Sequence, residues 1–437
     1  MSTIINSSKV FLTKRISDLT SAESKALFDR TTSSDESVSQ ATAKIVSEVR
    51  RDGDQSLKRY AAEFDRVTLD SLEVPKGRWM GALDRLSPEL RTSLERAARN
   101  IAAVHAAFLP KEQMTSPEAG IRIARRPDPL DRVGVYAPGG RAAYPSSVLM
   151  GAVPARVAGV REVILCSPPG SDGLPSLTVL AAAELANVDR VFAIGGAGAI
   201  AAMAYGTQSV PRVERIVGPG NAYVAEAKLQ VSGAVAIDSP AGPSELLVIA
   251  DSTAIPMVVA REVMAQAEHD PMAAVVVVAV DEKSANSILS AIDDLILSQS
   301  RRVIIEQSLS SRGAVLIAES MEEAVKFAND FAPEHLLIAT SNAEQLLPQL
   351  RNAGTIFVGE TSSVAFGDYM SGANHVLPTG GLARSYSGLS VLDFIRWTTY
   401  QVIDRSAAAS LAADVGNFAD AEGLPAHAAT ARQWGVA

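Results

Sequence analysis

Cysteine is almost absent from this sequence, and its scarcity excludes two kinds of structure. Cys166 is the only cysteine among 437 residues. An intrachain disulfide and a metal site built from several thiolates are therefore both impossible. Disulfides belong mainly to oxidising compartments, so a single cysteine favours a cytoplasmic protein. The first residues, MSTIINSSKVFLTKR, agree with this prediction because they lack the apolar core of a secretory signal.

Long hydrophobic runs and an excess of positive charge are missing as well. The apolar run AAVVVVAV at residues 273–280 is far shorter than the roughly 20 residues that cross a bilayer. Lysine and arginine number 40 against 49 aspartates and glutamates, which gives a net charge of −9. This balance argues against non-specific binding to nucleic acids or anionic membranes. We expect neither as a partner.

Aromatic residues are also few, at 5% of the chain, whereas small apolar residues are abundant. This composition is typical of alanine-rich helices packed on buried strands. From about residue 121 onward, short apolar runs alternate with Gly/Pro turns and helical segments, first up to residue 245 and then again in the same style. That alternation predicts open parallel sheets. The expected fold is α/β, with two Rossmann-like, incompletely doubly wound lobes that face a cleft.

The same pattern predicts how the chain is divided. Residues 1–30 are expected to form a helical N-terminal extension. Residues 31–135 and 246–388 are expected to form a first α/β lobe, which would carry the metal-binding and catalytic side chains. Residues 136–245 would form a second α/β lobe on the dinucleotide side. Residues 389–437 are expected to be a helical tail.

Three glycine-rich turns in the second lobe are candidates for anion binding. They read YAPGG at 136–140, IGGAGAIAAM at 194–203 and VGPGNAYV at 217–224. Each follows a predicted strand, and two of them open a helix, where free backbone N–H groups attract a phosphate. The fingerprint G-x-G-x-x-G is absent in its usual form, and glycines at such turns also serve turn geometry alone. Together the turns predict a nucleotide or dinucleotide site.

Histidine is scarce, with five residues in the chain. Four of them lie in polar segments within or after residues 246–388. In AQAEHDP, Gln266 and His269 are three residues apart and so lie one helical turn from each other. They offer two ligand atoms to one point, or else His269 merely caps a helix that Pro271 ends. In FAPEHLLI, Glu334 and His335 form an adjacent acid and base before a buried strand, which suits proton transfer.

Two later segments add polar side chains. The glycine-rich stretch FGDYMSGANHVLPTGG at 366–381 contains Asp368 and His375, and AEGLPAH near the C-terminus contains Glu422 and His427. Long polar loops seldom exist for packing alone. One possible ligand set of nitrogen and oxygen atoms suits Zn²⁺ or Mn²⁺ with positions left for a substrate: Gln266, His269, Asp368 and His427. The alternative is a set of general-base or simply hydrogen-bonded histidines.

Taken together, these segments resemble the histidinol dehydrogenase family, over about residues 30–432. The resemblance rests on motifs in the family's order and spacing: RVGVYAPGGRAAYPSSVLM, VGPGNAYVAEAK, DSPAGPSELLVIAD, QAEHD, FAPEHL, GDYMSGANHVLPTGG and EGLPAH. It implies an NAD-dependent, four-electron oxidation of L-histidinol to L-histidine through L-histidinaldehyde, the last steps of histidine biosynthesis. It also implies one zinc ion per subunit, which Mn²⁺ can replace and which mainly orients the substrate.

The resemblance also assigns roles to individual residues. His335 would be the base for the alcohol step and Glu334 would activate water for the aldehyde step. The zinc ligands would be Gln266, His269, Asp368 and His427. The substrate pocket would comprise Ser244, Gln266, His269, His335, Asp368, His375, Glu422 and His427. The dinucleotide would contact Tyr136, Gly198 and Asn221.

The family's quaternary structure explains why a chain end should carry Glu422 and His427. It is a domain-intertwined homodimer with shared active sites, in which the tail of one subunit completes the site of its partner. The tail of residues 389–437 is therefore expected to contribute His427 to the other subunit.

Several positions bear on alternative functions. Gly198 stands where the family commonly has a cofactor-contacting glutamine, and Val364 stands where glutamate is frequent. A related branch of the fold oxidises a sulfonated diol, but Glu422 disfavours an anionic substrate there. A catalytically silent metal-binding scaffold would need neither Glu334 nor His335. Cys166 as a nucleophile for the aldehyde is disfavoured, because a lone cysteine in an apolar strand usually belongs to the core.

Overall fold

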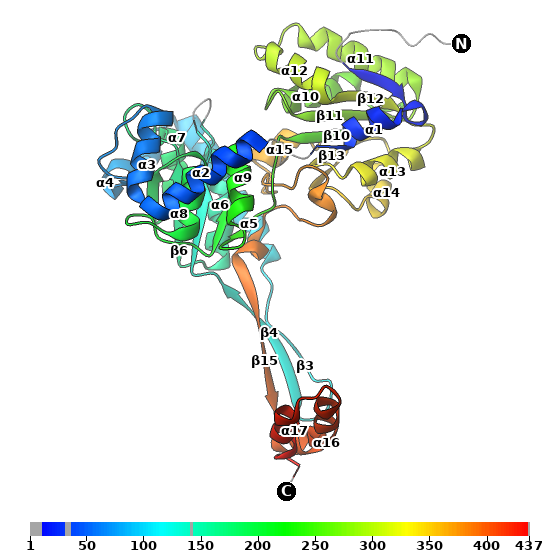
Figure 1. The fold of residues 1–437 in the computed structure, drawn as a ribbon. Coiled ribbons are helices and arrows are strands. Elements are labelled where there is room, and N and C mark those ends of the chain that lie inside the picture. Colours follow the sequence, from blue (N-terminus) through cyan, green and yellow to red (C-terminus); the bar gives the residue numbers. More distant parts are fainter. Residues whose placement is uncertain (1–10, 31–35, 140–142, 436–437) are drawn as a thin grey trace.

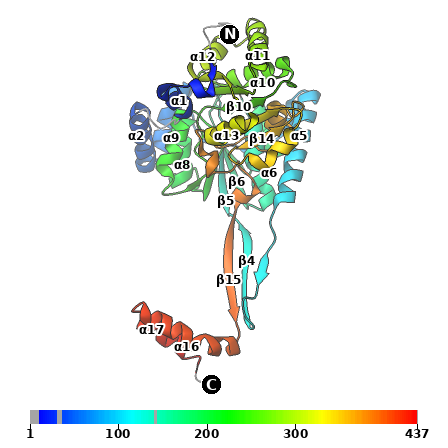
Figure 2. The ribbon, with the colours of Figure 1, turned by 90° about the vertical axis from the view of Figure 1, so that its right-hand side faces the viewer.

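The computed structural model describes residues 11–30, 36–139 and 143–435, which form two α/β lobes and a protruding arm (Figure 1). The arm extends from the second lobe and carries the C-terminal helices far from both lobes, as the view turned by 90° also shows (Figure 2). The predicted α/β class with parallel sheets is confirmed.

The first lobe is built on a six-stranded, fully parallel sheet. Its strands in spatial order are β1 (Leu12–Arg15), β12 (Gly313–Ile317), β11 (Ala274–Ala279), β10 (Glu245–Ala250), β13 (His335–Ala339) and β14 (Thr355–Val358). Alternate side chains of each strand face opposite sides of a sheet. Leu246 and Val248 accordingly belong to one apolar cluster, whereas Leu247 and Ile249 belong to another.

Helices cover both faces of this sheet. The cluster of Leu246 and Val248 also contains side chains of α10 (Pro256–Ala267), α11 (Glu282–Ile296) and α12 (Arg302–Arg312). The cluster on the other face contains side chains of α1 (Ser21–Phe28), α13 (Met321–Phe331) and α14 (Ala343–Leu346). The first lobe is therefore doubly covered, which explains why its strands read as uninterrupted apolar runs.

The second lobe has a six-stranded sheet of its own. Its spatial order is β2 (Glu73–Val74), β7 (Arg190–Ala193), β6 (Glu162–Ser167), β5 (Arg132–Tyr136), β8 (Arg215–Val217) and β9 (Ala236–Ile237), and only β2 is antiparallel. Helices α6 (Pro145–Ala158), α7 (Leu177–Leu185), α8 (Gly196–Tyr205) and α9 (Ala222–Val231) connect these strands. Right-handed β-α-β connections of this kind place the helices on the two faces.

The helices between residues 36 and 108 pack on this second lobe, so the predicted assignment of residues 31–135 to the first lobe is wrong. They are α2 (Glu36–Asp52), α3 (Asp54–Tyr60), α4 (Lys76–Trp79) and α5 (Pro88–Phe108). Helix α2 lies against α8 and α9, and α5 lies against α6. Val49, Trp79 and Ile101 share one core with Val135 of β5. An amphipathic helix reveals that one face is buried but not which sheet covers it.

Two further predictions about the chain ends need correction. Residues 1–30 were expected to be a helical extension, but Leu12–Arg15 form the edge strand β1, which pairs in parallel with Ala314–Ile317. Residues 389–437 were expected to be helical, but Ile395–Ile403 form the long strand β15. Its sequence IRWTTYQVI is rich in β-branched and aromatic residues, which favour strands.

The arm begins with an antiparallel sheet in the order β15, β4 (Ile121–Pro129), β3 (Gln113–Thr115). The register of β15 on β4 runs from Ile395 opposite Pro129 to Ile403 opposite Ile121. Beyond it, α16 (Arg405–Ala421) and α17 (Pro425–Arg432) form a helical hairpin. No helix in the described part of the chain is long and apolar enough to cross a membrane.

Candidate active site

The predicted acid and base residues lie at strand ends of the first lobe, and the predicted glycine-rich turns lie at strand ends of the second lobe. In the first lobe, β10 begins at Glu245 and β13 begins at His335, so the acid and base residues lie at the amino ends of parallel strands. In the second lobe, the glycine-rich turns follow the carboxyl ends of β5, β7 and β8. The carboxyl edge is the usual ligand-binding edge of an open α/β sheet.

The side-chain carboxylates of Glu334 and Glu245 each accept a hydrogen bond from the backbone N–H of the other residue. The Glu245 N–H donates to Glu334 Oε2 at 2.7 Å, and the Glu334 N–H donates to Glu245 Oε2 at 3.3 Å. Both side chains are buried, with relative exposures of 5% for Glu334 and 2% for Glu245. The carboxylate of Glu334 is therefore fixed directly beside the imidazole of His335, at 3.4 Å from Nδ1.

The imidazole of His335 has a defined tautomer. Its Nδ1 lies 2.9 Å from the carbonyl oxygen of Glu245, and a carbonyl can only accept, so Nδ1 carries the proton. Its Nε2 is buried, has no hydrogen-bond partner in the part of the chain that the structure describes, and lies 3.5 Å from Asp368 Oδ1. Burial disfavours the imidazolium, but Glu334 and Asp368 outweigh burial and hold the pKa of His335 well above its usual value. The raised pKa favours the imidazolium, whose Nε2 lies beside Asp368. Loss of the Nε2 proton leaves a lone pair there, which a general base requires.

Asp368 and His375 come from the polar loop predicted to be functional. Asp368 lies on the short helix α15 (Val364–Tyr369), and His375 Nδ1 donates to the backbone carbonyl of Asp368 at 3.0 Å. Burial opposes ionisation of Asp368, but the charge of His335, whose Nε2 lies 3.5 Å from Oδ1, lowers the pKa of this carboxyl below its usual value. His375 Nε2 lies 3.5 Å from the hydroxyl of Ser147 on α6. The loop therefore connects the first lobe to the second.

Gln266 and His269 lie at the end of α10, with Gln266 in its last turn. One turn earlier, Glu262 accepts the Val364 N–H at 3.2 Å, so α10 packs against the start of α15. Gln266 is one turn beyond Glu262 and Asp368 is one turn beyond Val364, which directs these two side chains to the same region. The Gln266 amide nitrogen is buried without a partner among the described residues. His269 is exposed two residues beyond the end of α10 and lines the same pocket as Tyr369.

Glu422 and His427 lie elsewhere in the single chain. Glu422 ends α16 and His427 lies on α17, both exposed on the hairpin at the far end of the arm (Figure 1). The remaining predicted pocket residue, Ser244, is half-buried directly before β10, and its carbonyl accepts the Ala274 N–H at 3.0 Å. Direct contacts in one chain thus link Glu334, His335, Asp368 and His375. Among the described residues, no three His, Cys, Asp or Glu side chains are grouped closely enough to hold a metal ion.

The second lobe presents the predicted dinucleotide residues. The Tyr136 hydroxyl accepts the Gly196 N–H at 3.0 Å, which links two of the glycine-rich turns. Asn221 is exposed and caps α9 by accepting the Val224 N–H at 3.2 Å. Gly218 has a φ of +121°, and a Cβ there would lie 2.0 Å from the Tyr136 carbonyl oxygen, so only glycine fits this turn.

Gly198 and Val364 both face protein interior. Gly198 is buried in α8, where a Cβ would lie 3.1 Å from a methyl carbon of Leu57 on α3. Val364 is buried in the apolar cluster that includes α10. The side chain of a glutamine at position 198 would therefore point from its Cβ toward Leu57. Glycine avoids this close contact.

Two residues that the sequence did not single out belong to the site. Glu245 accepts and donates hydrogen bonds at Glu334, and the buried Arg30 pairs with Glu245. Glu245 could have been found in the sequence because it directly precedes the apolar run LLVIA. A charged residue at the start of a buried strand usually needs a partner. Arg30 carries no such signal, because 215 residues separate it from Glu245.

The fold and the site define a class: a two-lobed α/β enzyme in which a buried glutamate–histidine pair lies on one lobe and glycine-rich turns suited to a dinucleotide lie on the other. A histidinol dehydrogenase family model matches residues 28–433. The chain belongs to the histidinol dehydrogenase family and is an oxidoreductase.

Individual relatives agree over nearly the full chain. A histidinol dehydrogenase of Methanosarcina barkeri is 45% identical over 420 residues, covering 96% of each chain. That of Natronomonas pharaonis is 48% identical over 417 residues, covering 94% of this chain and 97% of the relative. The crystal structure of histidinol dehydrogenase from Elizabethkingia anophelis superimposes with a TM-score of 0.92 at 33% identity, covering 97% and 98% of the two chains.

Cys166 lies in β6 with no exposed surface, and burial raises the pKa of its thiol far above its usual value. A thiol in this state is neither reactive nor accessible to an aldehyde. We predict that Cys166→Ala retains at least half of the turnover of the unaltered chain and lowers stability by about 1 kcal/mol. Steady-state kinetics and thermal unfolding measure both. Loss of the aldehyde step alone would contradict this prediction.

Proposed function

We propose that this chain catalyses the NAD-dependent, zinc-containing, four-electron oxidation of L-histidinol to L-histidine through L-histidinaldehyde, as the last steps of histidine biosynthesis. The observation that carries the proposal is the arrangement of His335. Its Nδ1–H donates to the Glu245 carbonyl, its Nε2 has no hydrogen-bond partner among the described residues, and Glu334 lies 3.4 Å from Nδ1. The names of its full-length relatives support histidinol as the substrate.

In the first step, His335 Nε2 takes the proton of the alcohol hydroxyl while a hydride leaves the carbon that bears this hydroxyl. In the second step, Glu334 takes a proton from the water that adds to the aldehyde carbon, and a second hydride leaves the resulting hydrate. NAD, when bound, accepts one hydride in each step. Because Glu334 and His335 are neighbours on one rigid strand end, a single substrate position serves both steps.

The chemistry of the donor set supports zinc. Gln266, His269 and Asp368 offer nitrogen and oxygen atoms without a thiolate. Gln266 would bind zinc through its amide oxygen, because its buried amide nitrogen is a donor only. His427 from a partner subunit would be the fourth ligand. A zinc ion held by these residues would supply a Lewis-acidic centre for binding and orienting the amino-imidazole substrate, and Mn²⁺ suits the same oxygen and nitrogen donors.

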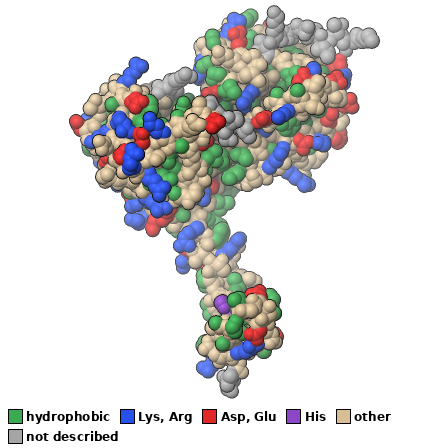
Figure 3. All heavy atoms as spheres, in the orientation of Figure 1, with side chains coloured by type: hydrophobic (Ala, Val, Ile, Leu, Met, Phe, Trp, Pro, Cys, Tyr) green, Lys and Arg blue, Asp and Glu red, His purple; other side chains and the backbone are tan. Residues whose placement is uncertain are grey.

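The remaining contacts follow from position. Ser244 and His375 border the first lobe's strand ends and would hold the substrate, together with Glu422 from a partner subunit. On the second lobe, Tyr136 and Asn221 would contact the dinucleotide at the carboxyl edge of the sheet, whereas Gly198, buried against Leu57, would offer it no side chain. Charges of both signs are interspersed over the face of the two lobes in Figure 3, and no large basic area faces the viewer there.

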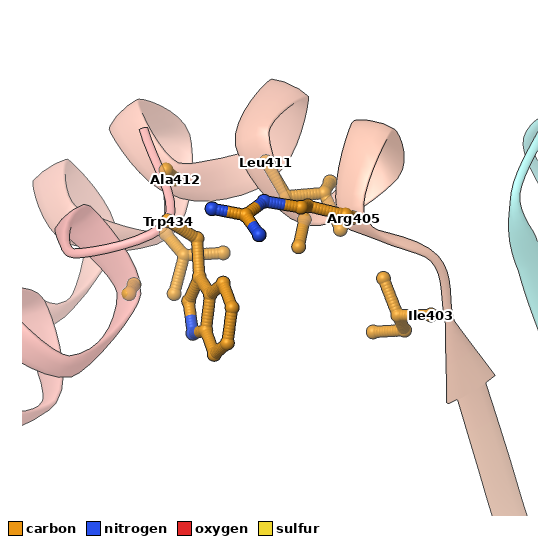
Figure 4. Close-up of a pocket in the computed structure, with 8 residues that line it drawn as sticks. Ile403, Arg405, Leu411, Ala412 and Trp434 are labelled. Atoms are coloured by element: carbon orange, nitrogen blue, oxygen red, sulfur yellow. The ribbon is translucent and has the colours of Figure 1, made fainter. Parts of the chain in front are cut away.

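The arm supports a homodimer with shared sites. Phe418 and Trp434 are 72% and 48% exposed, and exposed apolar groups of this size commonly mark an interface. A hollow of about 460 Å³ lies on the hairpin, where Trp434 and Leu411 face Ile403 and Arg405 (Figure 4). A second copy of the chain would cover these groups and bring Glu422 and His427 into its site.

Substitution of His335 should slow the alcohol step, whereas substitution of Glu334 should slow the aldehyde step. His335→Asn keeps a donor for the Glu245 carbonyl but removes the base, so we expect alcohol oxidation to fall about 10²- to 10⁴-fold. Glu334→Gln keeps an acceptor for the Glu245 N–H but cannot take a proton, so aldehyde formation should persist while acid formation slows about 10²-fold or more. Rapid-quench measurement of each half-reaction distinguishes them. Equal loss in both steps for Glu334→Gln would remove it as the water-activating group.

Mixing subunits tests the shared site. His269→Ala and His427→Ala homodimers should each be nearly inactive, because each lacks one zinc ligand at every site. After dissociation and reassociation in equal amounts, a mixed dimer has one site that lacks both ligands and one that is complete. We expect about a quarter of the unaltered activity in the mixture, since half of the dimers are mixed and each has one intact site of two. No recovery would show that the ligands come from a single chain.

A further inference from the structure

Arg30 and Glu245 form a buried ion pair beneath the catalytic pair. Arg30 Nη1 lies 2.5 Å from Glu245 Oε2, and both side chains have only 2% of their surface exposed. The Arg30 Nε has no hydrogen-bond partner among the described residues. Removing two charges from water costs more than such a pair commonly returns, above all when one donor is unsatisfied. Stability alone is therefore a poor reason for the pair.

Glu245 contacts both catalytic residues with three different atoms. Its backbone N–H donates to the Glu334 carboxylate, its side chain accepts the Glu334 N–H, and its carbonyl oxygen accepts the His335 Nδ1–H. The other side-chain oxygen accepts the Gly380 N–H at 2.7 Å. Glu245 thus connects the amino end of β13 with the loop that carries His375.

Arg30 fixes the other side of this connection. Its Nη2 donates to the carbonyl oxygen of Phe331, three residues before Glu334, and its guanidinium lies 3.5 Å from the centre of the Phe331 ring. The planar guanidinium therefore binds the end of α13 and the start of β10 at once, which a lysine ammonium cannot match in geometry. Four segments meet at this point: Arg30, the turn before β10, the turn before β13 and the Gly380 loop.

We infer that Arg30 and Glu245 are positioning residues that hold Glu334 and His335 in their reactive orientation. They contact the backbone around the two catalytic side chains and would act through these side chains. The inference rests on the proposed roles of Glu334 and His335. A displacement of about 1 Å in such groups is enough to lower turnover roughly 10²-fold without loss of the fold.

The test removes the pair as a unit. Arg30→Met/Glu245→Gln replaces both charges with neutral side chains of similar length, so no unpaired charge remains buried. Arg132→Met/Glu162→Gln is the matched control, because it removes an Arg–Glu pair of the other lobe at the amino ends of β5 and β6, away from every proposed contact. Arg30→Lys keeps the charge and serves if the double variant does not fold.

The measurements are kcat and KM for histidinol and the ¹H–¹⁵N resonance of His335 Nδ1–H, which is tractable because the chain has five histidines. We expect kcat to fall at least about tenfold in both half-reactions, KM to stay within about threefold, and the resonance to move. Arg30→Lys should lower kcat less and move the resonance in the same direction. The control should leave kcat and the resonance unchanged.

An unmoved resonance, with or without loss of kcat, would overturn the inference, because any loss would not act through His335. A kcat within twofold of the unaltered chain would overturn it as well. The resonance does not depend on turnover. If the unaltered chain failed to oxidise histidinol, the proposed function would fail, while the resonance would still report whether the pair positions His335.

Discussion

The hydrogen bond from His335 Nδ1–H to the carbonyl of Glu245 is the contact on which the site depends. It fixes the tautomer, so that the lone pair of the neutral ring is on Nε2, where the substrate must lie. The bond exists because β10 and β13 are adjacent parallel strands with Leu246 opposite His335. Strand pairing in the first lobe, and not a loop, therefore sets the geometry of the base. Sites on rigid elements are held more accurately than sites on loops.

The two lobes contribute to the site from different ends of their sheets. The second lobe follows the usual rule, with its glycine-rich turns at the carboxyl ends of β5, β7 and β8. The first lobe uses the amino ends of β10 and β13, where the backbone N–H of Glu245 is free to bind a carboxylate. Residues 366–381 join the lobes, since Asn374 donates to the Met150 carbonyl on α6 at 2.8 Å.

Local features of the site could be predicted from the sequence, because local spacing determines them. Gln266 and His269 are placed by one helical turn, and Glu334 and His335 by the start of a buried strand. The alternation of strands and helices also gave the two parallel sheets. These signals need no knowledge of distant segments.

The features that depend on long-range packing could not be predicted from the sequence. The apolar face of α2 fits either sheet in principle, and only the folded chain shows that α8 and α9 cover it. The edge strand β1 is short and polar in part, so it resembled a helical extension. The pairing of Arg30 with Glu245 and the position of His427 on a distant arm are set by tertiary structure, which no local pattern encodes.

The most direct test is the yield of NADH and the product formed when purified, zinc-loaded protein exhausts a known amount of L-histidinol, with a sulfonated diol assayed in parallel. Two NADH per histidinol with L-histidine as the product, and no turnover of the diol, is the result that a single site with both Glu334 and His335 predicts. Turnover of the diol without turnover of histidinol, or zinc binding without any NADH, would contradict the account.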